Sequence, residues 1–149
     1  MDHQDELSAS DYRALAEFRF QLRRFLRFSE KAARRANVEP QQYRALLALK
    51  GLPDDLKPTV GALAERLQIA HHSAVELADR LVQHGLLERT RDTADRRQVF
   101  LSLTPEGAAL LRELAVDHRT ELRSIGPALV TALEALLSDA SSGGAPPSS

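Results

Sequence analysis

Residues 85–107 read GLLERTRDTADRRQVFLSLTPEG. Within this stretch, Val99, Leu101 and Leu103 alternate with Phe100 and Ser102, and this period of two is the pattern of a β-strand. The segment 86–91 precedes it across the polar loop 92–97. Two short segments joined by such a loop predict a β-hairpin.

A helix is expected directly after the hairpin. Thr104 fits its N-cap, Pro105 its first position, and Glu106 is favourable at the positive end of the helix dipole. This helix should run to about Arg123. Gly126-Pro127 is expected to interrupt it before a last, leucine-rich helix.

Two helices with a short connection are expected before the hairpin. Thr59 is a plausible N-cap for a helix ending near Leu67. The next helix is predicted from about His72 to His84, and Gly85 should end it in the left-handed conformation. Its inward positions at helical spacing are Ala74, Leu77, Ala78 and Leu81. A helix pair followed by a hairpin is the plan of a winged helix-turn-helix, so the fold class is mainly α with a small β-hairpin wing.

A long helix is predicted over residues 10–36, with Ser10 as its N-cap. At about 1.5 Å per residue it spans nearly 40 Å, which exceeds the core of so small a domain. A second copy of the chain is therefore the expected partner. Pro40 should open the following helix, whose inward residues are predicted to be Tyr43, Leu46, Leu47 and Leu49.

Composition narrows the function classes. The 149 residues are 43% apolar and 28% charged, with net charge −1 and no cysteine, which excludes disulfides and thiolate catalysis. Neither a membrane-length apolar run nor a signal-peptide core occurs, so we expect a cytoplasmic protein with no membrane partner. Phosphate-loop, nucleophile-elbow and zinc-protease motifs are missing, so we expect neither an enzyme nor a cofactor.

Arginine supplies 17 of the 20 basic residues, and this residue suits bidentate contacts with phosphates and bases. The second helix of the pair fits the major groove of double-stranded DNA. The hairpin tip carries Arg96 and Arg97, with Arg91 leading to it, and tip arginines suit a narrow minor groove. Asp95 is expected to orient one of these guanidinium groups.

The hairpin and the residues after it resemble the multiple antibiotic resistance regulator (MarR) family. The family pattern is an Asp, a short gap, Asp-Arg-Arg, an alternating apolar strand, then Leu-Thr, two residues and Gly. The matching positions are Asp92, Asp95, Arg96, Arg97, Leu101, Leu103, Thr104 and Gly107. Thr93 stands where many relatives have Pro, which leaves the tip more flexible. The order of elements also matches over about residues 10–140.

The resemblance implies a homodimeric regulator, usually a repressor, that binds a pseudo-palindromic operator and often responds to a small aromatic or phenolic effector. It implies that Arg97 enters the minor groove and that Asp95 is a structural partner within the wing. It also implies a recognition helix over His72–Gln83. The residues then expected to contact DNA are His71, His72, Ser73, Glu76, Arg80, Arg91, Arg96 and Arg97.

The expected organisation is a disordered N-terminus (1–9), dimerisation helices (10–36 and 105–140), a winged helix-turn-helix lobe (37–104) and a disordered tail (141–149). The last helices and the first offer more apolar surface than the lobe can cover. The residues expected in a dimer interface are Leu15, Phe18, Leu114, Leu129, Leu133 and Leu136.

Two other functions remain open. A winged helix that binds protein instead of DNA is favoured by the acidic Glu76 and the near-zero net charge. A metal-responsive regulator would use His71, His72 or His118. Adjacent helical histidines point about 100° apart and do not converge on one ion, so we expect no metal.

Overall fold

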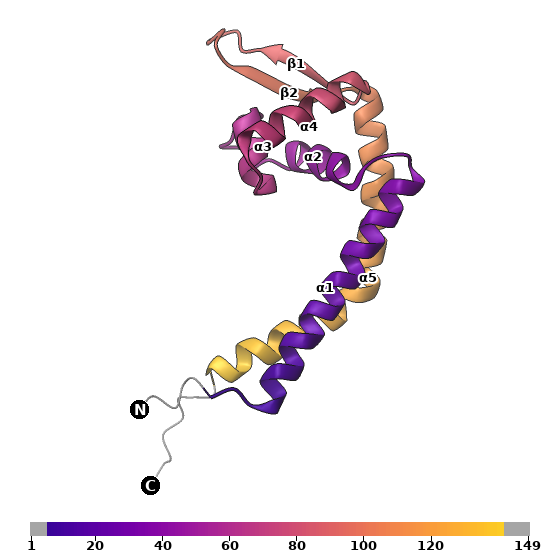
Figure 1. Ribbon diagram of the computed structural model, residues 1–149, viewed down its shortest axis with the longest axis vertical. Helices are drawn as coiled ribbons and strands as arrows, with labels where there is room; N and C mark the ends of the chain where they lie inside the picture. The colour runs from indigo at the N-terminus through magenta and orange to yellow at the C-terminus, as the bar shows by residue number, and fades with distance from the viewer. Residues whose placement is uncertain (1–5, 142–149) are drawn as a thin grey trace. The chain divides into compact units, whose positions relative to one another are not determined.

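The computed structural model describes residues 6–141 and confirms a mainly helical chain with one small hairpin (Figure 1). Its elements are, in order, α1 (Ala9–Arg35), α2 (Pro40–Lys50), α3 (Val60–Leu67), α4 (His71–Gln83), β1 (Leu87–Arg91), β2 (Val99–Leu103) and α5 (Pro105–Ser141). Most of the two predicted disordered ends, residues 1–5 and 142–149, lies outside the described part. Ser141 itself is helical, so the predicted tail begins one residue too early.

The chain divides into two compact units. Glu30–Asp117 forms one, here called the winged unit. The described parts of Met1–Ser29 and His118–Ser149 form the other, here called the helical unit.

The core of the winged unit is built from leucines of five elements. Those less than 2% exposed are Leu46, Leu63, Leu77, Leu81, Leu87 and Leu101. They come from α2, α3, α4 and both strands, so the three helices and the hairpin share a single core. Burial of a leucine side chain contributes about 1.5–3 kcal/mol, which makes this core the main stabilising feature of the unit.

Helix α2 begins at Pro40, as predicted, but its inward face is not the predicted one. Tyr43, Leu46 and Leu49 are buried, whereas Leu47 is 44% exposed. Leu47 lies about 100° further round the helix than Leu46, which carries it off the core face. Burial raises the pKa of the Tyr43 phenol above its ordinary value of 10.0.

The start of α1 also differs from the prediction. Ser8, not Ser10, caps the helix: its Oγ accepts a hydrogen bond from the Asp11 amide at 3.2 Å. The Asp11 carboxylate accepts in return from the Ser8 amide at 2.8 Å. This reciprocal pair satisfies two end donors and starts the helix at Ala9.

The predicted break at Gly126-Pro127 is wrong, because α5 is helical from Pro105 to Ser141 with Pro127 inside it. Proline removes one backbone donor, but its ring holds φ near the helical value, so the chain can continue as helix. The Thr131 hydroxyl donates to the Pro127 carbonyl at 2.9 Å.

The interior of the helical unit holds a buried histidine. His118 is 5% exposed, and its Nε2 lies 2.7 Å from Ser29 Oγ. The rings of Phe25 and Phe28 meet the imidazole edge-on, with centroids 6.0 and 5.6 Å away. His118 therefore joins α1 to α5 through packing and a hydrogen bond.

Candidate nucleic-acid interface

A short turn presents α4 to the surface of the winged unit. Thr59 caps α3 through a 3.1 Å hydrogen bond from Ala62 N, as predicted. Gln68 ends the helix with a left-handed φ of 56°, and the Ile69 amide donates back to the Ala64 carbonyl at 3.0 Å. These bonds satisfy the last carbonyls of α3 and redirect the chain into α4.

One face of α4 is buried and the opposite face is open. The four positions predicted to point inward, Ala74, Leu77, Ala78 and Leu81, are all at most 1% exposed. On a helix of 3.6 residues per turn, the row opposite them runs through residues 72, 76, 79 and 83. His72, Glu76 and Gln83 on this row are exposed.

Most of the predicted DNA-contact residues of α4 lie near its start. His71 and His72 are exposed in the first turn, Ser73 is half-buried, and Glu76 follows one turn later. Gln83 lies on the same open row but was not predicted. The spacing of the four inward residues was sufficient to reveal it.

Arg80, which is also predicted to contact DNA, lies in the last turn of α4, away from the residues at the start of the helix. Its Nη1 is 3.6 Å from Glu39 Oε2, at the N-cap of α2. The side chain therefore reaches along the surface of the unit toward α2.

The hairpin extends past α3 and α4 (Figure 1). Its strands are antiparallel, with Leu87 opposite Leu103 and Arg91 opposite Val99. Both strands end at the predicted residue, and each begins one residue later than predicted. Only Leu87 and Leu101 point fully into the core, whereas Arg91 is exposed near the tip.

The tip is ordered by Asp95. Its Oδ1 accepts a hydrogen bond from the Arg97 amide at 3.0 Å and lies 3.6 Å from Arg97 Nε. The Arg97 side chain is nonetheless 95% exposed, and Arg96 beside it is also exposed. Both guanidinium groups are thus available to an anionic partner.

Two contacts fix the hairpin against the rest of the unit. Arg89 of β1 forms an ion pair with Asp79 of α4. On β2, the Leu101 amide donates to the Pro58 carbonyl at 2.7 Å. In addition, the Lys57 ammonium group lies 3.5 Å from the Gln98 side chain. The contacts that Asp79 and Lys57 make with the hairpin were not predicted from the sequence.

The base of the wing is closed by the Thr104–Gly107 segment. Thr104 Oγ1 donates to the Gly85 carbonyl at 2.6 Å and accepts from the Gly107 amide at 3.0 Å. Gly85 has φ 72°, the left-handed conformation expected after α4. A Cβ on Gly107 would overlap the Leu86 carbonyl oxygen, so only glycine allows α5 to start this close to the hairpin.

Among the side chains that the structure describes, those of residues 6–138, no three histidine, aspartate or glutamate groups gather as metal ligands would. His71 and His72 are exposed neighbours on α4, and His118 is buried in the helical unit. Nor does any helix in the described part combine the length and apolarity needed to span a membrane.

A helix-turn-helix with a β-hairpin wing defines a winged helix-turn-helix lobe. The sequence profile of the MarR family matches residues 36–98, which cover most of it. The chain is 34% identical over 111 residues to the organic hydroperoxide resistance transcriptional regulator of Bacillus subtilis. That alignment spans 67% of this chain and 73% of the relative. The chain belongs to the MarR family.

Two further Bacillus subtilis relatives, the uncharacterised HTH-type regulator YsmB and the HTH-type repressor MdtR, are 33% and 38% identical. The chain spans only 58% and 51% of their own length. Solved structures agree on the fold. YusO of Bacillus subtilis has a TM-score of 0.58 at 28% identity, covering 79% of this chain and 83% of its own.

The Bordetella bronchiseptica protein BpsR, whose DNA binding is regulated by 6-hydroxynicotinic acid, has a TM-score of 0.60 at 25% identity. The match covers 83% of this chain and 94% of BpsR.

Proposed function

We propose that this chain is a homodimeric, sequence-specific DNA-binding transcriptional regulator that represses its target and is released by a small ligand. In this proposal, α4 enters the major groove and the Arg96–Arg97 tip enters the adjacent minor groove. The observation that carries it is the pairing of an exposed α4 face with an arginine tip held by Asp95. The relatives named as transcriptional regulators support it.

Local charge supports DNA as the partner in spite of the net charge of −1. Arg91, Arg96 and Arg97 lie together at the wing tip and are exposed. These arginines attract phosphates because the electrostatic field at the tip depends on where the charges lie, not on the net charge of the whole chain.

Repression is favoured by the likeness to the repressor MdtR, and ligand release by the likeness to BpsR, which responds to 6-hydroxynicotinic acid.

The homodimer is supported by the apolar surface of the helical unit. Large apolar side chains there are 39–68% exposed: Leu7, Tyr12, Leu15, Phe20, Leu22, Leu26, Leu122, Val130, Leu133 and Leu137. An apolar surface of this extent marks an interaction site in a soluble protein.

The residues predicted at the dimer interface differ in accessibility. Leu15 and Leu133 are exposed, and Phe18, Leu129 and Leu136 are half-buried. Leu114 is 2% exposed within one chain, so the proposed interface uses the other five.

Titration against duplex DNA tests the proposal. Selection from a random duplex pool would supply the operator, and affinity would then be measured at several salt concentrations. A dimer contacting about six phosphates should give a slope of log affinity against log salt near −5.

Arg97→Ala should weaken operator binding by about 1–3 kcal/mol without changing the dimer.

Arg123→Ala is the matched control, because Arg123 is an exposed arginine of the helical unit. It should leave operator affinity unchanged. Equal losses of operator affinity in both variants would mean that the wing has no special role.

The second candidate function, a protein-binding winged helix, is favoured by the acidic Glu76 on the open row of α4. It predicts that no duplex is selected from the pool.

A further inference from the structure

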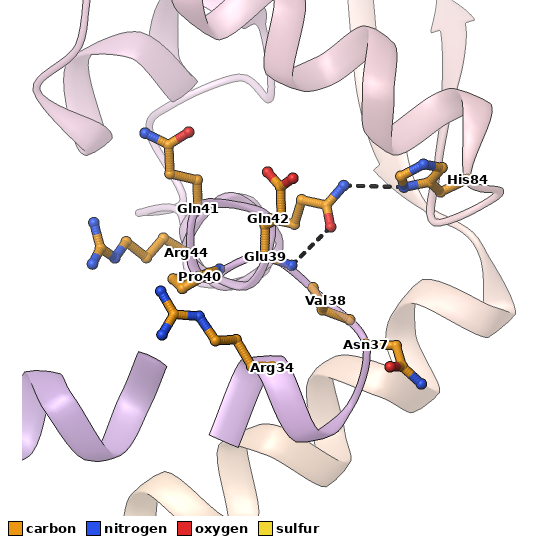
Figure 2. A pocket seen from close by; sticks show the side chains of 9 residues that line it. All are labelled: Arg34, Asn37, Val38, Glu39, Pro40, Gln41, Gln42, Arg44 and His84. Carbon is orange, nitrogen blue, oxygen red and sulfur yellow. Dashed lines mark hydrogen bonds between the residues drawn. The ribbon is translucent and has the colours of Figure 1, made fainter. Parts of the chain in front are cut away.

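A buried glutamine joins the start of α2 to the end of α4 (Figure 2). Gln42 lies in the first turn of α2 and is only 3% exposed. Its Oε1 accepts a hydrogen bond from the Glu39 amide at 3.1 Å, and its Nε2 is 3.0 Å from Nδ1 of His84, the C-cap of α4. All three residues belong to the winged unit. The two contacts use both the oxygen and the nitrogen of the Gln42 side-chain amide.

The Glu39 amide fixes which atom of Gln42 faces His84. A backbone N–H only donates, so the atom opposite it must be the Gln42 oxygen. The NH₂ group of Gln42 then faces His84 Nδ1 and must donate to it. Nδ1 accepts only when it carries no proton, so a neutral His84 ring holds its single proton on Nε2. A charged ring would place the N–H of Nδ1 against the N–H of Gln42, and the contact would open.

This contact restrains α4 in a way that the apolar face of the helix does not. The four inward residues of α4 are buried, but apolar contact has no preferred direction, whereas a hydrogen bond has one. The other polar contact with the start of α2, Arg80 with Glu39 at 3.6 Å, joins side chains that are 46% and 63% exposed, so it restrains the helix weakly. Gln42 therefore provides the stronger polar restraint from α2 on the end of α4.

The restraint acts at the end of α4 opposite to the expected DNA contacts. His84 follows His72 by 12 residues, or about 18 Å along the helix. A tilt of α4 by about 5° about His84 would move its first turn by about 1.6 Å. That shift exceeds the spread of about 0.5 Å in the length of a good hydrogen bond. His84 can thus affect operator binding without touching DNA.

We propose that Gln42 is a positioning residue for the recognition helix: it holds neutral His84 through Nδ1, and protonation of His84 releases the end of α4 and weakens operator binding. The second half of this inference rests on the proposed DNA-binding function. Charge alone would give the opposite result, since a positive ring attracts phosphates. A loss of affinity in acid that depends on His84 would therefore report the contact with Gln42.

The surroundings of His84 contain further charges that the test must hold constant. The loop after α1 contributes Asn37, and α5 contributes the apolar Leu110. The charged side chains around it, from α1, α2 and α4 itself, are Arg34, Glu39, Arg44 and Arg80. A substitution of His84 leaves all of them in place, so a changed pH response can be assigned to the imidazole.

The contact is tested without DNA. In the ¹⁵N-labelled whole chain at about pH 8, where an ordinary imidazole is neutral, long-range ¹H–¹⁵N spectra should show His84 with a proton on Nε2 and none on Nδ1. Gln42→Glu replaces the donor by an acceptor, so the proton of His84 should move to Nδ1. A proton on Nδ1 in the wild type, or an unchanged ring in Gln42→Glu, would overturn the contact.

The positioning role is tested with the selected operator. Gln42→Met keeps the length of the side chain and removes its donor, so operator affinity at about pH 8 should fall by about 3- to 10-fold, the usual effect of one net hydrogen bond. Gln41→Met is the matched control, because Gln41 is the exposed neighbour on α2, and it should keep wild-type affinity. An unchanged amide spectrum outside α2 and the end of α4 shows that Gln42→Met is folded. Wild-type affinity in folded Gln42→Met would overturn the positioning role.

His84→Asn separates protonation from the contact, and it does not depend on the folding of Gln42→Met. The Asn oxygen can accept from Gln42 as Nδ1 does, but it does not titrate. Wild type and His84→Asn should bind the operator equally at about pH 8. At about pH 5.5, where an ordinary imidazole is charged, His84→Asn should bind about 3- to 10-fold more tightly. The ratio of the two affinities cancels the titration of His71 and His72, because both chains keep them.

Equal affinities of the wild type and His84→Asn at both pH values would overturn the protonation step. Failure of the wild type to bind any duplex would overturn the proposed function, and the position of the proton on His84 would then decide the contact by itself.

Discussion

Gly107 occupies a position where a side chain has no room. A Cβ there would overlap the Leu86 carbonyl oxygen, which belongs to the backbone at the base of the wing. Gly107→Ala should therefore destabilise the protein by about 1–3 kcal/mol, the cost of overpacking, although alanine favours a helix. Thermal unfolding followed by circular dichroism would measure the loss.

Gly126→Ala is the matched control. Gly126 also lies in α5, but nothing lies within 4 Å of a Cβ built on it. Alanine there should change the free energy of unfolding by less than about 1 kcal/mol, because its higher helix propensity is opposed by crowding of its Cβ against the ring of Pro127. A Gly107→Ala variant as stable as Gly126→Ala would contradict the close approach of α5 to Leu86.

At the residue scale, the sequence predicted those residue roles that depend only on neighbours along the chain. Gly85 and Thr59 were predicted correctly, since a helix end and an N-cap follow from local chemistry. Gly107 was found only as part of a family motif, because the carbonyl that it must avoid lies 21 residues earlier. The prediction of Ser10 as the N-cap of α1 was wrong. Both Ser8 and Ser10 precede the apolar pattern of the helix, and the hydrogen bond from the Ser8 amide to the Asp11 carboxylate makes Ser8 the cap.

At the scale of elements, the Arg89–Asp79 ion pair ties the wing to α4. Both side chains are partly exposed, at 39% and 49%, so the pair should contribute less than about 1 kcal/mol to stability. Its larger effect should be on orientation. Asp79→Asn should loosen the wing and weaken operator binding, while thermal unfolding changes little.

The charge-reversed double variant Asp79→Arg/Arg89→Asp provides the test of pairing. It should recover part of the affinity lost in each single variant, as judged by a double-mutant cycle on operator binding. Additive losses in the cycle would show that the two residues act separately.

The elements themselves were largely predictable. The hairpin was placed within a residue because Val99, Leu101 and Leu103 recur at every second position, a period that a helix does not have. The Gly126-Pro127 break was wrong because both residues are weak helix formers, yet apolar positions on either side keep one helical pattern. The pairing of Asp79 with Arg89 could not be read, because it depends on how the hairpin folds back over α4.

For the whole molecule, the apolar pattern of the sequence predicted more apolar surface than one chain can bury. The structure leaves Leu15, Leu133 and Leu137 exposed in the helical unit. The spacing of two recognition helices depends on a second copy of the chain, so it stays a prediction. That spacing should be about 34 Å, one turn of B-form DNA.

Leu133→Asp tests the role of this surface. Leu133 is 40% exposed in one chain, so the interface can add only about 0.6–1.2 kcal/mol of burial for each leucine, or about 1.2–2.4 kcal/mol for the two copies in a two-fold interface. That loss corresponds to roughly one to two orders of magnitude in the dimer dissociation constant, and burial of the new carboxylate adds to it. Analytical ultracentrifugation across a concentration series should show monomers, and operator binding should fall because one half-site alone holds the chain weakly.

Leu47→Asp is the appropriate control, since Leu47 is similarly exposed, 44% against 40% for Leu133, but belongs to the winged unit. If exposure alone made aspartate disruptive, both variants would behave alike. If the helical unit carries the interface, Leu47→Asp stays dimeric at concentrations where Leu133→Asp dissociates. A dimeric Leu133→Asp variant with wild-type operator affinity would place the interface elsewhere and leave this apolar surface without its proposed partner.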